Sequence, residues 1–265
     1  EVVAYAGDAL AAIFPGPLGK VRLSAQIRRG IVERAARCAL KMQGAKLVLE
    51  QATGTHLEFK IGIGSGPIRL CHLGGKEGKW HLLLKGRGFS EAVFAEGSAK
   101  PGDTIVSPLT YEYLDGEGVK VRSLDSGCYK LLRLGHDNVT PARSVIPKLS
   151  VDELDALKGY ISPTVLRLVE SGQIEYLGET RPLTVMFINL PDIRPTGKLK
   201  DDQMMVTTLQ DAIFARGGQI NKLSVDEKGV SALAIFGLPP VVLEDVPLAG
   251  MEAARDVHQK MVERD

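Results

Sequence analysis

The feature that most constrains this chain is a pair of similar strand–turn–strand segments near its two ends. The first segment runs from Val2 to Phe14 (VVAYAGDALAAIF) and the second from Ile220 to Phe236 (INKLSVDEKGVSALAIF). Each is followed by a loop and then by a basic helix pattern that contains alanine, with an offset of about 220 residues between the copies. Since this offset is far longer than a solenoid repeat, it predicts two copies of one domain of ordinary size.

Length and composition agree with two globular domains. The chain has 265 residues, of which 44% are hydrophobic, and its formal charge is +1 with acidic and basic residues interspersed. This charge balance argues against nucleic acid or an anionic membrane as a partner. Because no apolar run is long enough for a membrane span and no signal peptide is evident, we expect a cytoplasmic protein. Cys38, Cys71 and Cys128 form no CxxC pair, which favours free thiols in a reducing compartment.

The local patterns predict helices and strands in an α+β arrangement, with helices on one face of the sheet. A helix is expected from Ser24, a good N-cap residue, to about Met42. Its apolar residues recur at helical spacing and predict the face that packs on a sheet, with Cys38 in the core: Ile27, Ile31, Ala35, Cys38 and Met42. Further strands are expected over 57–63, 68–73, 79–84, 104–107, 119–124, 129–134 and 183–190, and helices over 89–99, 151–160, 163–171 and 203–216. Residues 183–190 (LTVMFINL) are strongly apolar, which is typical of a strand buried on both faces.

Three glycines at alternate positions, Gly62, Gly64 and Gly66, raise the question of a phosphate-binding loop. Their spacing matches neither GxGxxG nor GxxxxGK[ST], so close packing of the backbone explains them better. The five histidines have no metal-ligand spacing, and no GxSxG nucleophile elbow is present.

The pattern predicts Asp8 at the tip of the first hairpin, directly after Gly7. A carboxylate at this position could bind a hard cation such as Mg²⁺, which prefers oxygen ligands. The Gly-Asp pair is also what an ordinary tight turn contains, and the residues alone leave both interpretations open.

Several stretches together resemble the class III nucleotidyl cyclases, and among these the tandem domains of soluble adenylyl cyclase. They are YAGDALAAIF, KIGIGSGPI, YLGETRPLTVMFINL and GGQINKLSVDEKG followed by ALAIFGLP. The resemblance implies two partial ferredoxin-like cyclase domains joined by a helical linker. It places part of the first domain at residues 1–135, the linker at 136–180 and part of the second domain at 181–265. Because the chain opens inside a strand and closes on a helix, we expect an internal fragment of a longer protein.

The resemblance also implies an active site between the two domains. ATP would be converted there to cyclic AMP and pyrophosphate with two Mg²⁺ or Mn²⁺ ions, and the two domains would pair within one chain. Asp8 matches one of two metal-binding aspartates of the family, and Lys222, in QINK, matches the lysine that reads the adenine. The other family residues would lie outside the 265 residues, so we expect the fragment alone to be inactive.

Other positions depart from the family pattern. Asn189 occupies the second domain's counterpart of a metal aspartate, which implies that this copy binds no metal. Ser90 and Phe94 replace an Asn and an Arg in the first domain, and Ala4 and Val93 replace the Lys and Arg of the family's bicarbonate site. An inactive pseudocyclase that serves as a nucleotide-binding or scaffolding module is therefore one alternative, and a guanylyl cyclase is another. Lys222 argues against the guanylyl cyclase, because an acidic side chain would suit guanine better.

Overall fold

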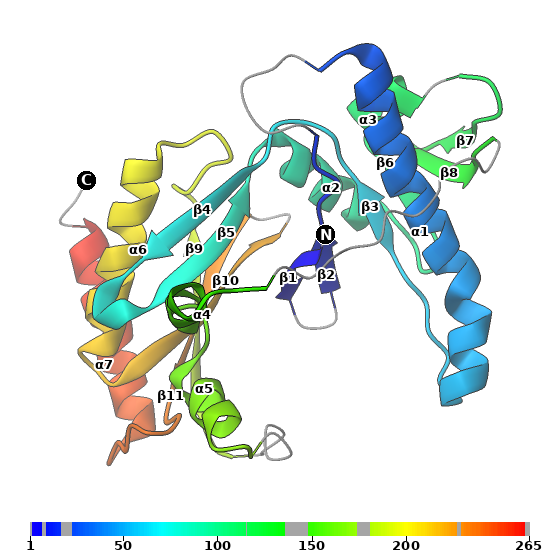
Figure 1. The fold of residues 1–265 in the computed structure, drawn as a ribbon. Helices are drawn as coiled ribbons and strands as arrows, with labels where there is room; N and C mark the ends of the chain where they lie inside the picture. Colours follow the sequence, from blue (N-terminus) through cyan, green and yellow to red (C-terminus); the bar gives the residue numbers. More distant parts are fainter. Residues whose placement is uncertain are drawn as a thin grey trace. The chain divides into compact units, whose positions relative to one another are not determined.

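The fold is seen in a computed structural model that describes residues 2–6, 9–16, 23–114, 116–135, 148–173, 181–226 and 229–262. Helices combine with several small sheets, which confirms the predicted α+β class (Figure 1). The described residues form two compact units that alternate along the chain: the first contains the residues up to Ile68 and those from Gly86 to Gly135, and the second contains Arg69–Lys85 and the residues from Lys148 onward. The assignment of cyclase domains to residues 1–135 and 181–265 stays a prediction.

The first unit contains two sheets and three helices. Strands β1 (Val2–Ala6) and β2 (Ala9–Ala12) form an antiparallel hairpin. A four-stranded sheet has the order β3 (Ile61–Ile63), β6 (Thr104–Val106), β8 (Tyr129–Arg133) and β7 (Lys120–Ser123). Only the β3–β6 pair of that sheet is parallel. The helices are α1 (Ala25–Thr53), α2 (Arg87–Gly97) and α3 (Pro108–Leu114).

Helix α1 begins at the predicted cap but buries a different face from the predicted one. The Ser24 side chain accepts a hydrogen bond from the backbone N–H of Ile27, and the helix continues to Thr53, beyond the predicted end at Met42. Ile27 is 44% exposed and Cys38 is also exposed, so the predicted core position of Cys38 is wrong. The buried residues lie one position further along the helix: Val32, Ala36 and Ala39. Both sets recur at helical spacing, and the set with two alanines faces the core because α1 packs closely on α3, β3 and β6.

The second unit joins a hairpin from the first half of the sequence to elements of the second half. The hairpin consists of β4 (Arg69–Gly74) and β5 (Trp80–Lys85), with the short 3₁₀ helix η1 (Lys76–Gly78) between them. The helices are α4 (Val151–Lys158), α5 (Pro163–Glu170), α6 (Leu199–Phe214) and α7 (Val246–Val262). An antiparallel sheet has the order β10 (Gly218–Asp226), β11 (Gly229–Phe236) and β9 (Thr184–Leu190). The predicted N-caps of α4 and α5 are confirmed, since Ser150 and Ser162 each accept a backbone N–H of the first turn.

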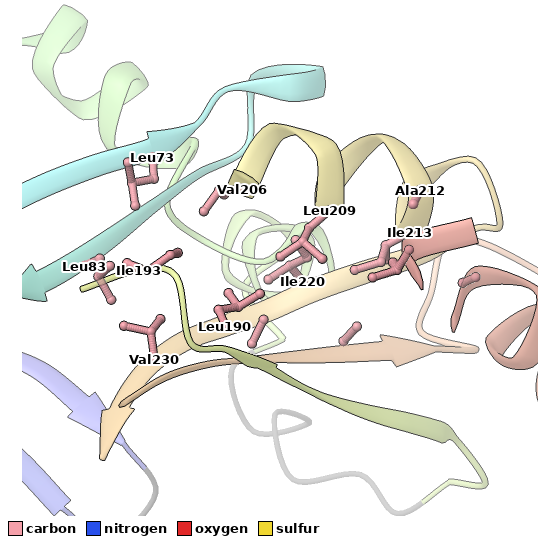
Figure 2. Close-up of a cluster of buried hydrophobic side chains, with 14 of the residues drawn as sticks. Leu73, Leu83, Leu190, Ile193, Val206, Leu209, Ala212, Ile213, Ile220 and Val230 are labelled. Carbon is pink, nitrogen blue, oxygen red and sulfur yellow. The ribbon is translucent and has the colours of Figure 1, made fainter. Parts of the chain in front are cut away.

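The core of the second unit lies between one face of this sheet, helices α6 and α7, and the β4–β5 hairpin (Figure 2). Burial alternates along β11, where Val230, Ala232, Ala234 and Phe236 point inward. Burial also alternates along β9, and Phe187 is 78% exposed. The prediction of a strand buried on both faces is therefore wrong, because the helices cover only one face of the sheet.

None of the helices in the described ranges combines the length and the apolar character needed to cross a membrane. Cys38, Cys71 and Cys128 are free thiols, and burial raises the pKa of both Cys71 and Cys128.

Candidate functional site

Lys222 lies on the outer face of the β10–β11–β9 sheet because of a β-bulge. Ile220 pairs with Ala234 and is buried on the inner face, whereas Lys222 pairs with Leu233, and the register shifts between Ile220 and Lys222. In a regular strand these two residues would point to the same side. The extra residue, Asn221, reverses this alternation, so the half-buried Lys222 side chain points away from the core.

Asn189 lies on the same outer face, one row of side chains away. It pairs with Ser231, which in turn pairs with Ser224, and the two serine Oγ atoms are 3.0 Å apart. Strand spacing and residue rise place the Cα atoms of Lys222 and Asn189 roughly 12 Å apart. The sheet therefore brings together a cation, an exposed amide and two hydroxyl groups, without a carboxylate in these rows.

Apolar side chains, together with Gln219 of β10, occupy the neighbouring rows of this outer face. Val185 and Phe187 of β9 are 49% and 78% exposed, and Leu233 and Ile235 beside them on β11 are half-buried. Such a surface can hold a flat apolar ring next to hydrogen-bonding groups, which is the chemical character of a nucleobase.

The predicted site residues of the first unit are described only in part. Asp8 and the side chain of Ala4 lie outside the described residues. Ser90, Val93 and Phe94 lie on α2, where the Ser90 hydroxyl donates to the Gly86 carbonyl at 3.3 Å and Phe94 is 51% exposed. These three positions carry no charged group that could bind an anion.

The glycines of the first unit pack against α2, as the sequence predicts. A Cβ atom on Gly62 would lie 2.2 Å from the carbonyl oxygen of Ala92, and one on Gly64 would lie 2.2 Å from the amide nitrogen of Ala92. Any side chain here would collide with the helix backbone. The need for close packing therefore explains both glycines without a bound phosphate.

The described residues do not contain a ready metal centre. In the part of the chain that the structure describes, no group of three His, Cys, Asp or Glu side chains is placed to hold a metal ion. The residues described here thus do not fit a metal on their own, and Asp8 remains a predicted ligand.

The second unit contains a buried ion pair that was not predicted from the sequence. Lys85, at the end of β5, pairs with Asp202 in the first turn of α6, and each side chain is 2% exposed. The sequence does indicate a buried lysine, because Lys85 directly follows the apolar run Leu82–Leu84. Its partner could not be predicted, because it lies 117 residues later in the sequence.

Comparison with known proteins covers almost the whole chain, although no family model matches it. Over 97% of its length it is similar to adenylate cyclase type 10 from Homo sapiens, with 25% identity over 295 residues. The proteins of the same name from Oryctolagus cuniculus and Mus musculus are each 24% identical over 97% of the chain. The predicted resemblance to an adenylate cyclase is confirmed. The chain spans 17% of the length of these cyclases. An enzymatic activity of the protein that contains this chain is therefore a proposal.

Proposed function

We propose that this chain is part of an adenylyl cyclase that converts ATP to cyclic AMP and pyrophosphate at a site shared by two cyclase domains. The observation that carries the proposal is the similarity to adenylate cyclase type 10 over 97% of the chain. The position of Lys222 and Asn189 on one open sheet face supports it. The proposal includes pairing of the two domains within one chain and a cytoplasmic location.

The proposed reaction needs positioning more than a protein nucleophile. The 3′-oxygen of ATP bonds to the α-phosphorus and loses its proton, while the bond from that phosphorus to pyrophosphate breaks. The proposal includes two divalent ions, Mg²⁺ or Mn²⁺, with Asp8 as one ligand. Asp8 lies outside the described residues.

Lys222 has the chemistry to select adenine. Its ammonium group only donates hydrogen bonds, and adenine presents N1 as an acceptor where guanine presents an N–H donor. The bulge in β10 directs Lys222 to the outer face, beside the half-buried Leu233 and the exposed Phe187. A base stacked on these apolar side chains would present its polar edge to the lysine. Asn189 is neutral and exposed, which agrees with a second domain that contributes base recognition and no metal ligand.

The proposal is tested by the variant Lys222→Glu in a protein that contains both complete domains. We expect kcat/KM for ATP to fall by roughly tenfold to a few hundredfold, because a hydrogen bond to a buried polar edge is lost. Discrimination against GTP should shrink at the same time. Lys120→Glu, at an exposed strand position of the first unit, is the matched control and should leave both values unchanged. Unchanged kinetics in Lys222→Glu would remove this residue from the site.

A second candidate is a pseudocyclase that binds nucleotide without turning it over. The neutral Asn189 and the uncharged Ser90 and Phe94 favour it, because none of these positions has a charge that would balance a metal ion or a phosphate. Asp8→Ala in the longer protein separates the two candidates: it should abolish cyclic AMP formation in a cyclase and leave nucleotide binding by a pseudocyclase largely intact. Cyclic AMP formed by the purified 265 residues would contradict the expectation that this chain alone is inactive.

A further inference from the structure

The β4–β5 hairpin comes from the first half of the sequence but completes the core of the second unit. Its inward side chains Cys71, Leu73 and Leu83 are 3%, 0% and 1% exposed. Figure 2 shows Leu73 and Leu83 facing Val206 of α6 and Val230 of β11 in one cluster. The hairpin is thus bound to a surface formed by residues more than a hundred positions later, since β4 contacts α6 and β5 contacts β10.

The apolar contacts of β5 do not by themselves define one alignment on this surface. The strand contains three consecutive leucines, Leu82–Leu84, so a shifted strand would still present a leucine to the core. Register is well specified only where a shift would bury a polar group or expose an apolar one.

At the tip of the hairpin, two glutamines of α6 bind backbone groups at defined positions. Gln203 donates to the Gly74 carbonyl at 2.7 Å and accepts from the Gly74 N–H at 2.9 Å. Gln210, which is fully buried, donates to the Lys79 carbonyl at 2.8 Å and accepts from the Lys76 N–H at 3.2 Å. These bonds also depend on the alignment, because Gly74 has a φ of +102° and an added Cβ atom there would lie 2.6 Å from the Gln210 Nε2 atom.

At the base of the hairpin, Lys85 directly follows the leucine run and is buried against a side chain of opposite charge. Lys85 pairs with Asp202 and also donates to the Gly197 carbonyl at 3.2 Å. Arg69, the register partner of Lys85 on β4, reaches the same carbonyl at 3.4 Å. A shift of β5 would leave the buried Asp202 carboxylate without a cation, which is strongly unfavourable.

We propose that the Lys85–Asp202 pair selects the single register in which the β4–β5 hairpin docks on the second half of the chain. Buried ion pairs are weak sources of stability compared with apolar pairs of similar size, and fixing register is their best-attested role. The leucine run supplies the apolar contact, Gly74 fits against the glutamines at the tip, and the ion pair disfavours shifted alignments at the base.

The test is hydrogen exchange of the full chain carrying Lys85→Met and Asp202→Leu together. Its readout is the amide protection of Gly74, Lys76 and Trp80, whose N–H groups bind Gln203, Gln210 and the Gly159 carbonyl. We expect a folded protein in which these three amides lose protection on the order of tenfold or more, while α6 keeps its own protection.

The control is the exposed ion pair Asp155–Lys158 on α4 of the same unit, replaced by Leu and Met. This variant should keep the native protection of all three amides. Native protection in the Lys85→Met/Asp202→Leu chain would overturn the proposal. A double variant that no longer folds would overturn it too, because the pair would then be needed for stability rather than for register.

Discussion

At the residue scale, the glycines of the first unit show how closely a loop approaches a helix. A Cβ atom on Gly64 would meet the Ala92 nitrogen at 2.2 Å and the Gly88 carbonyl oxygen at 2.3 Å, and both belong to the backbone of α2. Neither atom can move without moving the helix. In contrast, Gly44 lies in the exposed part of α1, with nothing within 4 Å of the added atom.

We therefore predict opposite effects for the same substitution at the two glycines. Gly64→Ala should lower the free energy of unfolding by about 1–3 kcal/mol or more, because the helix must shift. Gly44→Ala should raise it by about 0.5–1 kcal/mol, because alanine loses less backbone entropy in a helix. Urea unfolding of both variants measures this difference. Equal effects at the two sites would show that the approach of the loop to α2 is looser than described.

A second residue-scale prediction concerns His81 in β5. Burial lowers its pKa from 6.5 to about 4, and its Nε2 atom is buried with no hydrogen-bond partner among the described residues. Because the folded state resists protonation, the unfolded state binds more protons between pH 6.5 and about 4. The contribution of the neutral His81 to the free energy of unfolding is therefore fully present above pH 6.5. It falls as the pH drops toward about 4, by about 1.4 kcal/mol for each pH unit.

The contribution of His81 is isolated by comparison with His81→Gln, which cannot take up a proton. Between pH 7.5 and 5.5 the native chain should lose about 1.4 kcal/mol more than the variant in urea unfolding. This range avoids most carboxylate titration. Parallel pH profiles for the two proteins would place the native histidine in a wetter environment.

At the scale of elements, the N-cap residues in the sequence predicted where helices begin, whereas tertiary packing determined which face of a helix is buried. Ser24, Ser150 and Ser162 cap helices where the sequence placed them, because capping depends on residues within one turn. The buried face of α1 was wrong by one position, since two overlapping stripes have the same period. Helix α3 (Pro108–Leu114) was not predicted: Pro108 directly follows the strand predicted over 104–107, and proline is compatible with the first turn of a helix.

The residues of the candidate site could be predicted from the sequence, but their arrangement could not. The residue types at Lys222 and Asn189 were evident from the sequence, but the common face that they share was not. It depends on a bulge at Asn221, and strict alternation would have placed Lys222 beside Ile220 in the core.

The sheet of the second unit gives an element-scale prediction, because two phenylalanines lie on its opposite faces. Phe236 of β11 is fully buried and Phe187 of β9 is 78% exposed. Phe236→Ala should cost about 3–5 kcal/mol of unfolding free energy, as a cavity forms in the core. Phe187→Ala should change it by less than about 0.5 kcal/mol, as expected for a surface position. A large loss in Phe187→Ala would show that another surface covers this face in solution.

At the scale of the whole molecule, the two compact units are not successive pieces of sequence. The chain enters the second unit at Arg69, returns to the first after Lys85, and joins the second again after the segment that ends the first unit. The local sequence predicted β4 and β5 as strands, but it contains no information about which core they would join. That choice rests on pairs such as Lys85–Asp202 and Gly74–Gln203, which are far apart in the sequence.

Because the β4–β5 hairpin belongs to the second unit, we can predict which segments lose stability together. Leu209→Ala, in the core shared by α6 and the hairpin, should speed amide exchange in β4, β5, β10 and β11, since residues of one cooperative unit open together. Ile105→Ala, fully buried on β6 of the first unit, is the matched control and should speed exchange in β6 and β8. Each variant should cost about 2–5 kcal/mol, so the two differ in the location of the loss and not in its size. Hydrogen exchange measured by mass spectrometry distinguishes the units, and the peptide that covers Arg69–Lys85 decides the question. If that peptide responds to Ile105→Ala and not to Leu209→Ala, the hairpin belongs energetically to the first unit, and sequence order rather than packing defines the units.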